Sequence, residues 1–96
     1  MNKYEAITQA RKLLELPEQA TMAEIKTSYR RLMHRWHPDR CGDDPKCLEM
    51  AKRVIEAYKL LIDYCRRYKY SFTEEEVHRQ FADEEWWTRR FGEGPC

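Results

Sequence analysis

The sequence predicts an all-α fold, and three properties of the chain indicate it. The chain has 96 residues, which fits one domain with a thin hydrophobic core. Glycine is scarce, at 3 residues, whereas the helix-forming residues Leu, Glu, Lys and Arg are common. Apolar residues recur three and four positions apart over long stretches, which is the spacing of one helix face. We therefore expect an antiparallel helical hairpin with a short helix before it and another helix after it.

The first helix is expected over residues 3–15. Asn2 is a suitable N-cap, because Glu5 stands three residues later and can return a hydrogen bond. Pro17 ends the helix, since the residue before a proline avoids the helical conformation. The apolar face of this helix consists of Ile7, Ala10, Leu13 and Leu14.

The second helix is expected over residues 22–36, between a capping box formed by Thr21 and Glu24 and the helix-ending Pro38. The face expected in the core carries Ile25, Tyr29, Leu32 and Trp36. A second face is basic, with one row of Lys26, Arg30 and His34 and a neighbouring row of Arg31 and Arg35. The helix is therefore apolar on one side and cationic on another.

The third helix, over residues 45–68, is the longest that the sequence predicts. Asp44 suits its N-cap and Pro45 its first position. Its apolar face consists of Cys47, Ala51, Val54, Tyr58, Leu61, Cys65 and Tyr68, widened by Leu48, Ile55 and Ile62. Because only residues 37–44 connect it to the second helix, the two helices should form an antiparallel pair.

A fourth helix is expected over residues 74–90. Thr73 and Glu76 form its predicted capping box, and Phe72 and Val77 its predicted hydrophobic staple. The apolar residues of this segment are Val77, Phe81, Trp86, Trp87 and Phe91. We interpret Val77, Phe81 and one of the two tryptophans as packing onto the hairpin.

Charge is divided unevenly along the chain, although the net charge is only +1. Residues 21–40 carry five cations and two acids, whereas residues 71–96 carry seven acids and three cations. Two alternatives to packing of the fourth helix remain open: its acids cover the basic second helix, or Trp86, Trp87 and Phe91 stay exposed as anchors for a partner or client. The low net charge argues against nucleic-acid binding by the basic helix, which we keep as a lesser alternative.

The chain shows neither an amino-terminal apolar segment nor a membrane span, so we expect a cytoplasmic monomer. Its four cysteines, at positions 41, 47, 65 and 96, are irregularly spaced, and we expect reduced thiols. A zinc site is a weak alternative, since the spacing of His34, His37, Cys41 and Cys47 matches no common zinc module. We expect no cofactor and no enzymatic activity, because the chain has no phosphate-binding glycine loop and no recognisable catalytic frame.

The tripeptide His37-Pro38-Asp39 forms a corner after the basic helix. Pro38 fixes its own backbone and restricts that of His37. Such a corner presents an imidazole and a carboxylate to a partner at low entropic cost, and Asp39 can accept two hydrogen bonds from an arginine. The plainer interpretation, which spacing alone favours, is that Pro38 only ends a helix and Asp39 bonds within the loop.

Over about residues 3–66 the chain resembles the J domain of DnaJ-type co-chaperones. The resemblance is carried by EIKTSYRRLMHRWHPDR at 24–40, KRVIEAYKLL at 52–61 and YEAITQARKLLELPEQAT at 4–21. It implies stimulation of ATP hydrolysis by a DnaK-type chaperone of the seventy-kilodalton heat-shock class, with an arginine of the chaperone engaging the aspartate. By position it assigns partner contacts to the tripeptide His37, Pro38 and Asp39 and to Lys26, Tyr29, Arg30, Arg31, Arg35 and Arg40.

The resemblance predicts a J domain at residues 1–70 and leaves an acidic, aromatic helical extension at 71–96. The Gly/Phe-rich segment and Cys-x-x-Cys repeats of longer family members are absent, which is typical of members that have only a J domain. The basic pattern of the family's usual fourth helix is also missing, and Ala51 stands where a core phenylalanine is frequent. A degenerate J fold that acts only as a protein-interaction module is therefore the main alternative.

Overall fold

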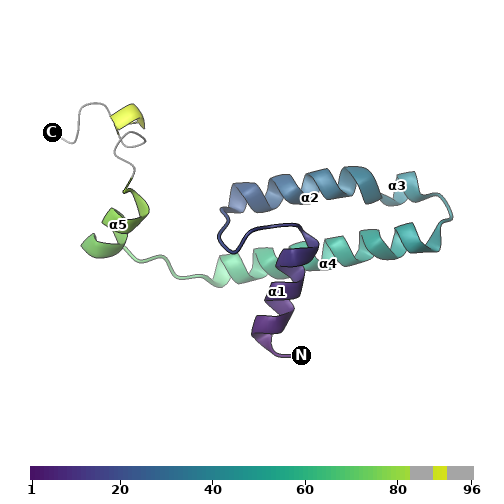
Figure 1. Ribbon diagram of the computed structural model, residues 1–96, viewed down its shortest axis with the longest axis horizontal. Helices are drawn as coiled ribbons and strands as arrows, with labels where there is room; N and C mark the ends of the chain where they lie inside the picture. The colour runs from purple at the N-terminus through teal and green to yellow at the C-terminus, as the bar shows by residue number, and fades with distance from the viewer. Residues whose placement is uncertain (83–87, 91–96) are drawn as a thin grey trace.

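Helices α2 (Met22–Trp36) and α4 (Pro45–Arg67) lie side by side and antiparallel, and form the long hairpin of the fold (Figure 1). The computed structural model describes residues 1–82 and 88–90, and every regular element within them is helical. The other helices are α1 (Lys3–Leu13), α3 (Pro38–Cys41) and α5 (Glu74–Gln80). The predicted all-α fold and its antiparallel hairpin are confirmed.

Helix α1 crosses the hairpin and packs against α4, so that three helices share one core (Figure 1). The buried residues of this core are Ala10, Leu14, Leu16, Ile25, Leu32, Val54, Ala57, Leu61 and Ile62. Trp36 packs against the core from its edge, and Ala51 is almost completely buried. Two predicted core positions are wrong, because Leu48 is exposed and Tyr68, which follows the last turn of α4, is 59% exposed.

The starts of the three longer helices agree with the predicted caps. Asn2 and Thr21 each form a complete capping box, with Glu5 and Glu24 respectively. The carboxylate of Asp44 accepts a hydrogen bond from the Lys46 N–H at 3.0 Å. These side chains satisfy N–H groups that have no partner within the helix.

The end of α1 comes two residues earlier than predicted, because the chain turns back in a Schellman motif. The N–H groups of Glu15 and Leu16 donate to the carbonyls of Lys12 and Arg11 at 3.0 and 3.1 Å. Glu15 has a φ of 58°, in the left-handed region, where a residue with a side chain is strained. The turn directs Leu16 into the core.

Helix α5 stands apart from the hairpin (Figure 1), and among the described residues it packs against none of the other helices. It ends at Gln80, so the predicted helix over residues 74–90 is too long. Phe72 is 87% exposed and does not form the predicted staple. The predicted packing of this helix on the hairpin is wrong for Val77, which is 36% exposed on a helix that contacts no other described helix. Outside the described residues lie Trp86, Trp87 and Phe91.

The acids of α5 do not cover the basic face of α2, since the two helices are not in contact. Glu76 pairs instead with Arg79 on its own helix. Within the described residues, the autoinhibitory alternative is therefore wrong for Glu74, Glu75 and Glu76. Outside them lie the other acids of the segment, Asp83, Glu84, Glu85 and Glu93.

Candidate functional site

The exposed face of α2 carries the cations predicted to bind a partner, and the helix divides them into two rows. Lys26 and Arg30 lie in one row, and Arg31 and Arg35 lie about 100° further around the helix. The Nη2 atom of Arg31 is 3.0 Å from the carboxylate of Glu15 at the end of α1. Arg31 is thus already engaged within the protein.

Tyr29 lies at the border between the basic row and the core. Its ring stacks on that of Tyr58 from α4, with centroids 3.9 Å apart and an interplanar angle of 13°. Both residues are half-buried. The stack joins the middle of α2 to α4 and fixes the surface beside Arg30.

His37 begins the tip of the hairpin and caps the single turn of α3. Its backbone is extended, with φ −56° and ψ 139°, as the following proline requires. Its Nδ1 accepts a hydrogen bond from the Asp39 N–H at 3.1 Å. Nδ1 is also 3.6 Å from the Asp39 carboxylate, but an ion pair would need a proton on the nitrogen that accepts the N–H. The hydrogen bond from the Asp39 N–H is the shorter of the two contacts and requires an Nδ1 that carries no proton.

The Asp39 carboxylate is 92% exposed at the tip. Its own backbone N–H holds the His37 ring, and the first residue of α3 is Pro38, whose fixed φ suits that position. The predicted stiff corner is thus a capped helical turn. The turn presents the Asp39 carboxylate outward, while His37 and Pro38 hold the backbone of Asp39 in place.

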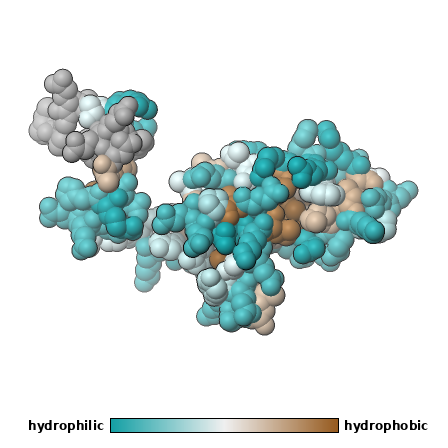
Figure 2. Space-filling model, in the orientation of Figure 1, coloured by the Kyte–Doolittle hydropathy of each residue, from teal (hydrophilic) through white to brown (hydrophobic). Residues whose placement is uncertain are grey.

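A shallow groove lies between the tip and the side of the hairpin, with walls from α2, α3 and α4. Of the predicted residues, those that line it are Tyr29, Arg30, His37, Pro38, Asp39 and Arg40. Three predicted residues do not line it: Lys26, Arg31 and Arg35. On the face shown in Figure 2, apolar residues gather between α2 and α4, and hydrophilic residues surround them.

Three residues that line this groove were not among the predicted partner contacts: Met33, His34 and Ile55. His34 follows Arg30 by one helical turn, and its Nε2 lies 3.4 Å from Arg40 Nη2. Ile55 stands at the margin of the apolar face of α4, where a residue can reach both core and surface. The periodicity of each helix contains these positions, but only the pairing of α2 with α4 brings them together.

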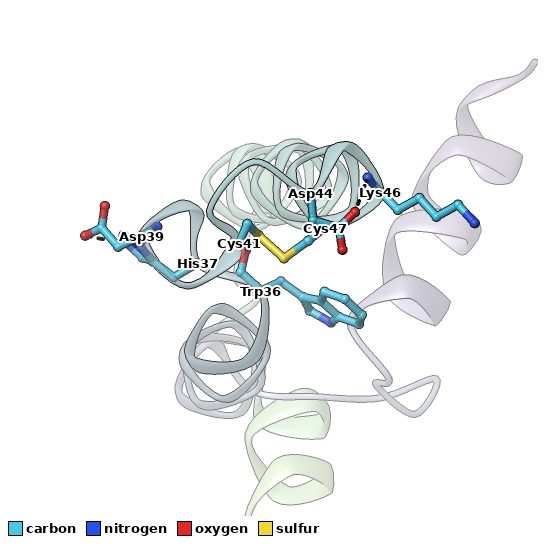
Figure 3. Close-up of a disulfide and its surroundings, with 7 residues drawn as sticks. All are labelled: Trp36, His37, Asp39, Cys41, Asp44, Lys46 and Cys47. Carbon is cyan, nitrogen blue, oxygen red and sulfur yellow. Dashed lines mark hydrogen bonds and ion pairs between the residues drawn. A yellow bond between two sulfur atoms is a disulfide. The ribbon is translucent and has the colours of Figure 1, made fainter.

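The loop after α3 is closed by a disulfide between Cys41 and Cys47, whose Cα atoms are 5.4 Å apart (Figure 3). The expectation of reduced thiols is therefore wrong for this pair, whereas Cys65 is a free, half-buried thiol. The loop reverses the chain through Gly42, which has a φ of 59°. This reversal brings the end of α3 over the first turn of α4, which cysteine spacing alone does not reveal.

The disulfide also bears on the zinc alternative, because two bonded sulfurs offer no thiolate to a metal. Within residues 1–82 and 88–90, no cluster of three or more His, Cys, Asp or Glu side chains is arranged to hold a metal ion. Over the same residues, no helix combines the length and the apolar character needed to cross a membrane.

The match to a known family includes α2, the tip and α4. A sequence profile described as "DnaJ domain" matches residues 9–71, about two-thirds of the chain. The chain belongs to the DnaJ-domain family. The resemblance to a J domain is thus confirmed, and the residues of the groove and of the tripeptide all lie within the matched range.

Several curated proteins are similar to this J domain. It is 43% identical over 65 residues to Chaperone protein dnaJ 39 of Arabidopsis thaliana, covering 68% of this chain and 16% of that protein. It is 32% identical over 89 residues to DnaJ homolog subfamily C member 5 of Mus musculus, covering 80% and 45%. It is 43% identical over 58 residues to Chaperone protein DnaJ 2 of Aquifex aeolicus, covering 60% and 15%. The chain thus spans less than half the length of each, and no solved structure matches it significantly.

Proposed function

We propose that this J domain is a co-chaperone that binds a DnaK-type chaperone of the seventy-kilodalton heat-shock class and stimulates its ATP hydrolysis. The observation that carries the proposal is the exposure of His37, Pro38 and Asp39 at the end of a basic helix in a DnaJ domain. The names of the relatives, which include chaperone proteins of plant and bacterial origin, support the same assignment.

In this proposal Asp39 supplies the specific contact. Its exposed carboxylate can accept two parallel hydrogen bonds from an arginine of the chaperone. His37 sets the direction of that carboxylate, because its ring Nδ1 accepts a hydrogen bond from the Asp39 backbone N–H at 3.1 Å. Since the turn is already formed before binding, little conformational entropy is lost when the contact is made.

The groove supplies the rest of the binding surface. Arg30 and Arg40 attract an acidic surface over a Debye length of about 8 Å at physiological salt. Met33 and Ile55 add apolar area between them. The J domain itself performs no chemistry in this account. Its binding energy favours the chaperone conformation that hydrolyses ATP.

Single-turnover ATP hydrolysis by a DnaK-type chaperone tests the proposal. The native chain should accelerate hydrolysis by about tenfold or more, which corresponds to lowering the activation barrier by at least about 1.4 kcal/mol. His37→Gln should abolish the acceleration because it removes the ring that holds Asp39. The matched control is His78→Gln, the same change at an exposed histidine of α5, which should stimulate like the native chain.

Both variants should keep the helicity of the native chain, because both histidines are exposed. Absence of acceleration by the native chain, across several DnaK-type chaperones, would overturn the proposal. It would favour the alternative of a degenerate J fold that serves only as a protein-interaction module.

A further inference from the structure

The disulfide joins the tip of the hairpin to the helix that supports it (Figure 3). Cys41 is the last residue of α3, two positions after Asp39, and Cys47 lies in the first turn of α4. Cys41 is only 8% exposed, whereas Cys47 is half-buried. The loop is also held by a hydrogen bond from the Asp44 N–H to the Cys41 carbonyl at 3.1 Å.

We propose that Cys41 and Cys47 form a reversible redox site, which a dithiol reductant opens, and that opening loosens the His37-Pro38-Asp39 tip. The redox site is independent of the proposed co-chaperone function. The effect of opening on ATP hydrolysis rests on that function.

The exchange proceeds in two steps. A thiolate of the dithiol attacks the Sγ of Cys47, the more exposed of the two residues, and forms a mixed disulfide with it. Cys41 leaves as a thiolate and takes a proton from water. The second thiol of the reductant then closes the reductant's own disulfide and releases Cys47. The reductant loses two electrons and two protons, and the cysteine pair gains them.

The surroundings of both sulfurs favour this exchange. Cys47 is the third residue of α4, where the aligned backbone dipoles of a 23-residue helix stabilise the thiolate that Cys47 becomes when the second step releases it. The Sγ of Cys41 lies 3.3 Å from the Trp36 carbonyl oxygen. A disulfide sulfur has no hydrogen to donate there, whereas the thiol of reduced Cys41 does. The reduced state therefore gains a hydrogen bond that the oxidised state lacks.

Opening should act mainly on the tip, because α3 depends on its connections. It has only four residues, too few for a helix that is stable alone. Its remaining backbone anchors on the α2 side are the Arg40 and Cys41 N–H groups, which donate to the His37 carbonyl at 2.8 and 3.1 Å. The disulfide closes a short ring that contains Gly42 and limits the conformations of the loop. Without it, the direction of Asp39 is less fixed.

The first part of the test uses the free protein. The native chain is equilibrated in mixtures of reduced and oxidised dithiothreitol, its thiols are alkylated, and peptide mass mapping locates the disulfide. We expect one two-electron transition at Cys41 and Cys47, with faster amide exchange of residues 37–44 in the reduced form. The control is the double variant Cys41→Ser and Cys47→Ser, whose exchange should not respond to the reductant.

The second part measures chaperone ATP hydrolysis with both forms. Reduction should raise the half-saturating concentration of the J domain about fivefold, the cost of ordering about one more backbone residue, and leave the maximal rate unchanged. The double-serine variant should have the half-saturating concentration of the reduced form, both with and without reductant. Any difference between these two measurements would report an effect of the reductant on the chaperone itself.

Complete alkylation of Cys41 and Cys47 in protein kept without reductant would overturn the inference. Equal amide exchange and equal half-saturating concentrations in the two forms would overturn it as well. If neither form stimulates the chaperone, the proposed function fails, and the amide exchange alone then decides whether the site controls the tip.

Discussion

Asp39 and Arg31, two residues assigned to partner binding, differ in the contacts that their side chains already make within the protein. The Asp39 carboxylate is almost wholly exposed, and only its backbone N–H is held, by His37. Arg31 is paired with Glu15 at 3.0 Å, and both side chains remain about half-exposed. Since an exposed pair of this kind contributes no more than about 1 kcal/mol, an acidic partner can displace it. The unusual feature of this pair is the backbone of Glu15, which has a left-handed conformation although Glu15 is not a glycine.

Replacing Glu15 by glycine should stabilise the fold. Its φ of 58° costs an L-residue about 1 kcal/mol, which glycine does not pay, and the lost pairing with Arg31 is worth less. We expect Glu15→Gly to raise the free energy of unfolding by about 0.5 kcal/mol in chemical denaturation. Glu18→Gly in the same connection, where φ is not positive, should give no increase. Equal effects of the two changes would contradict this explanation.

At the scale of elements, the starts of the helices could be predicted from the sequence and their ends much less so. A cap such as Thr21 with Glu24 is formed by residues three positions apart, so its pattern is visible in the chain. The end of α1 depends on a left-handed residue that is not glycine. Helix α3 is a single turn, too short to show a period, and the Cys41–Cys47 bond depends on where Gly42 sends the chain.

The capping box of α2 has a pH dependence with a definite sign. The backbone N–H of Thr21 and then its hydroxyl donate to Glu24 at 3.0 and 2.9 Å, and hold the pKa of Glu24 below its ordinary value of 4.5. The cap therefore stabilises α2 fully above that value and is lost as the pH falls through the lowered pKa. In an NMR titration the Glu24 carboxyl should have its midpoint below 4.5, and Thr21→Ala should raise it. A native midpoint at or above 4.5 would contradict the geometry.

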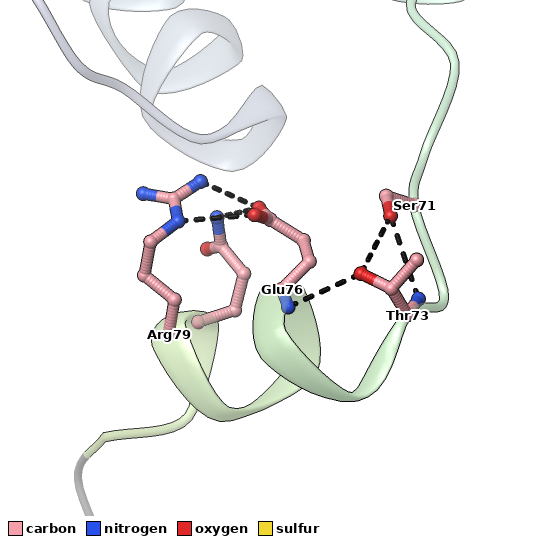
Figure 4. A network of polar contacts seen from close by, with 5 residues as sticks. Ser71, Thr73, Glu76 and Arg79 are labelled. Atoms are coloured by element: carbon pink, nitrogen blue, oxygen red, sulfur yellow. Dashed lines mark hydrogen bonds and ion pairs between the residues drawn. The ribbon is translucent and has the colours of Figure 1, made fainter.

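Helix α5 is held by contacts within its own segment (Figure 4). Thr73 accepts the Glu76 N–H at 3.3 Å, as predicted for its cap, and the Ser71 hydroxyl accepts the Thr73 N–H at 3.4 Å. The Glu76 carboxylate does not return to the cap. It accepts hydrogen bonds from the side chains of Arg79 and then Gln80, which lower its pKa. The predicted capping box is thus only half formed, on a helix that has no packed face among the described residues.

The described part of the molecule combines a packed three-helix unit with helix α5, which does not pack against that unit (Figure 1). The hairpin could be predicted because α2 and α4 each have a long apolar face, and each face is removed from water only by packing against the other. The separate position of α5 could not, since an apolar residue such as Val77 looks the same in the sequence whether or not another helix packs against it. The boundary between residues 70 and 71 stays a prediction, and so does the cytoplasmic location. Detection of the protein in separated cell fractions would test that location.

As far as the described residues determine it, deletion of residues 71–96 should leave the stability of the hairpin unchanged, because α5 contributes nothing to its core. We expect the unfolding temperature to change by less than about 2 °C, whereas Leu14→Ala, which opens a cavity in the core, should cost about 3 kcal/mol. Chaperone binding by the deleted form should also be unchanged at low salt. Tighter binding after deletion would instead indicate that acids of the tail compete for the basic face.

The central claim is that the exposed carboxylate of Asp39 makes the contact that stimulates a DnaK-type chaperone. The most direct measurement is single-turnover ATP hydrolysis with Asp39→Asn and with Asp63→Asn. Each change neutralises one exposed carboxylate. Asp63 is the control because it lies on α4, away from the tip, where its carboxylate forms an ion pair with Arg67 at 3.1 Å. We predict that Asp39→Asn loses stimulation with native helicity, while Asp63→Asn stimulates like the native chain. Native stimulation by Asp39→Asn would contradict the account.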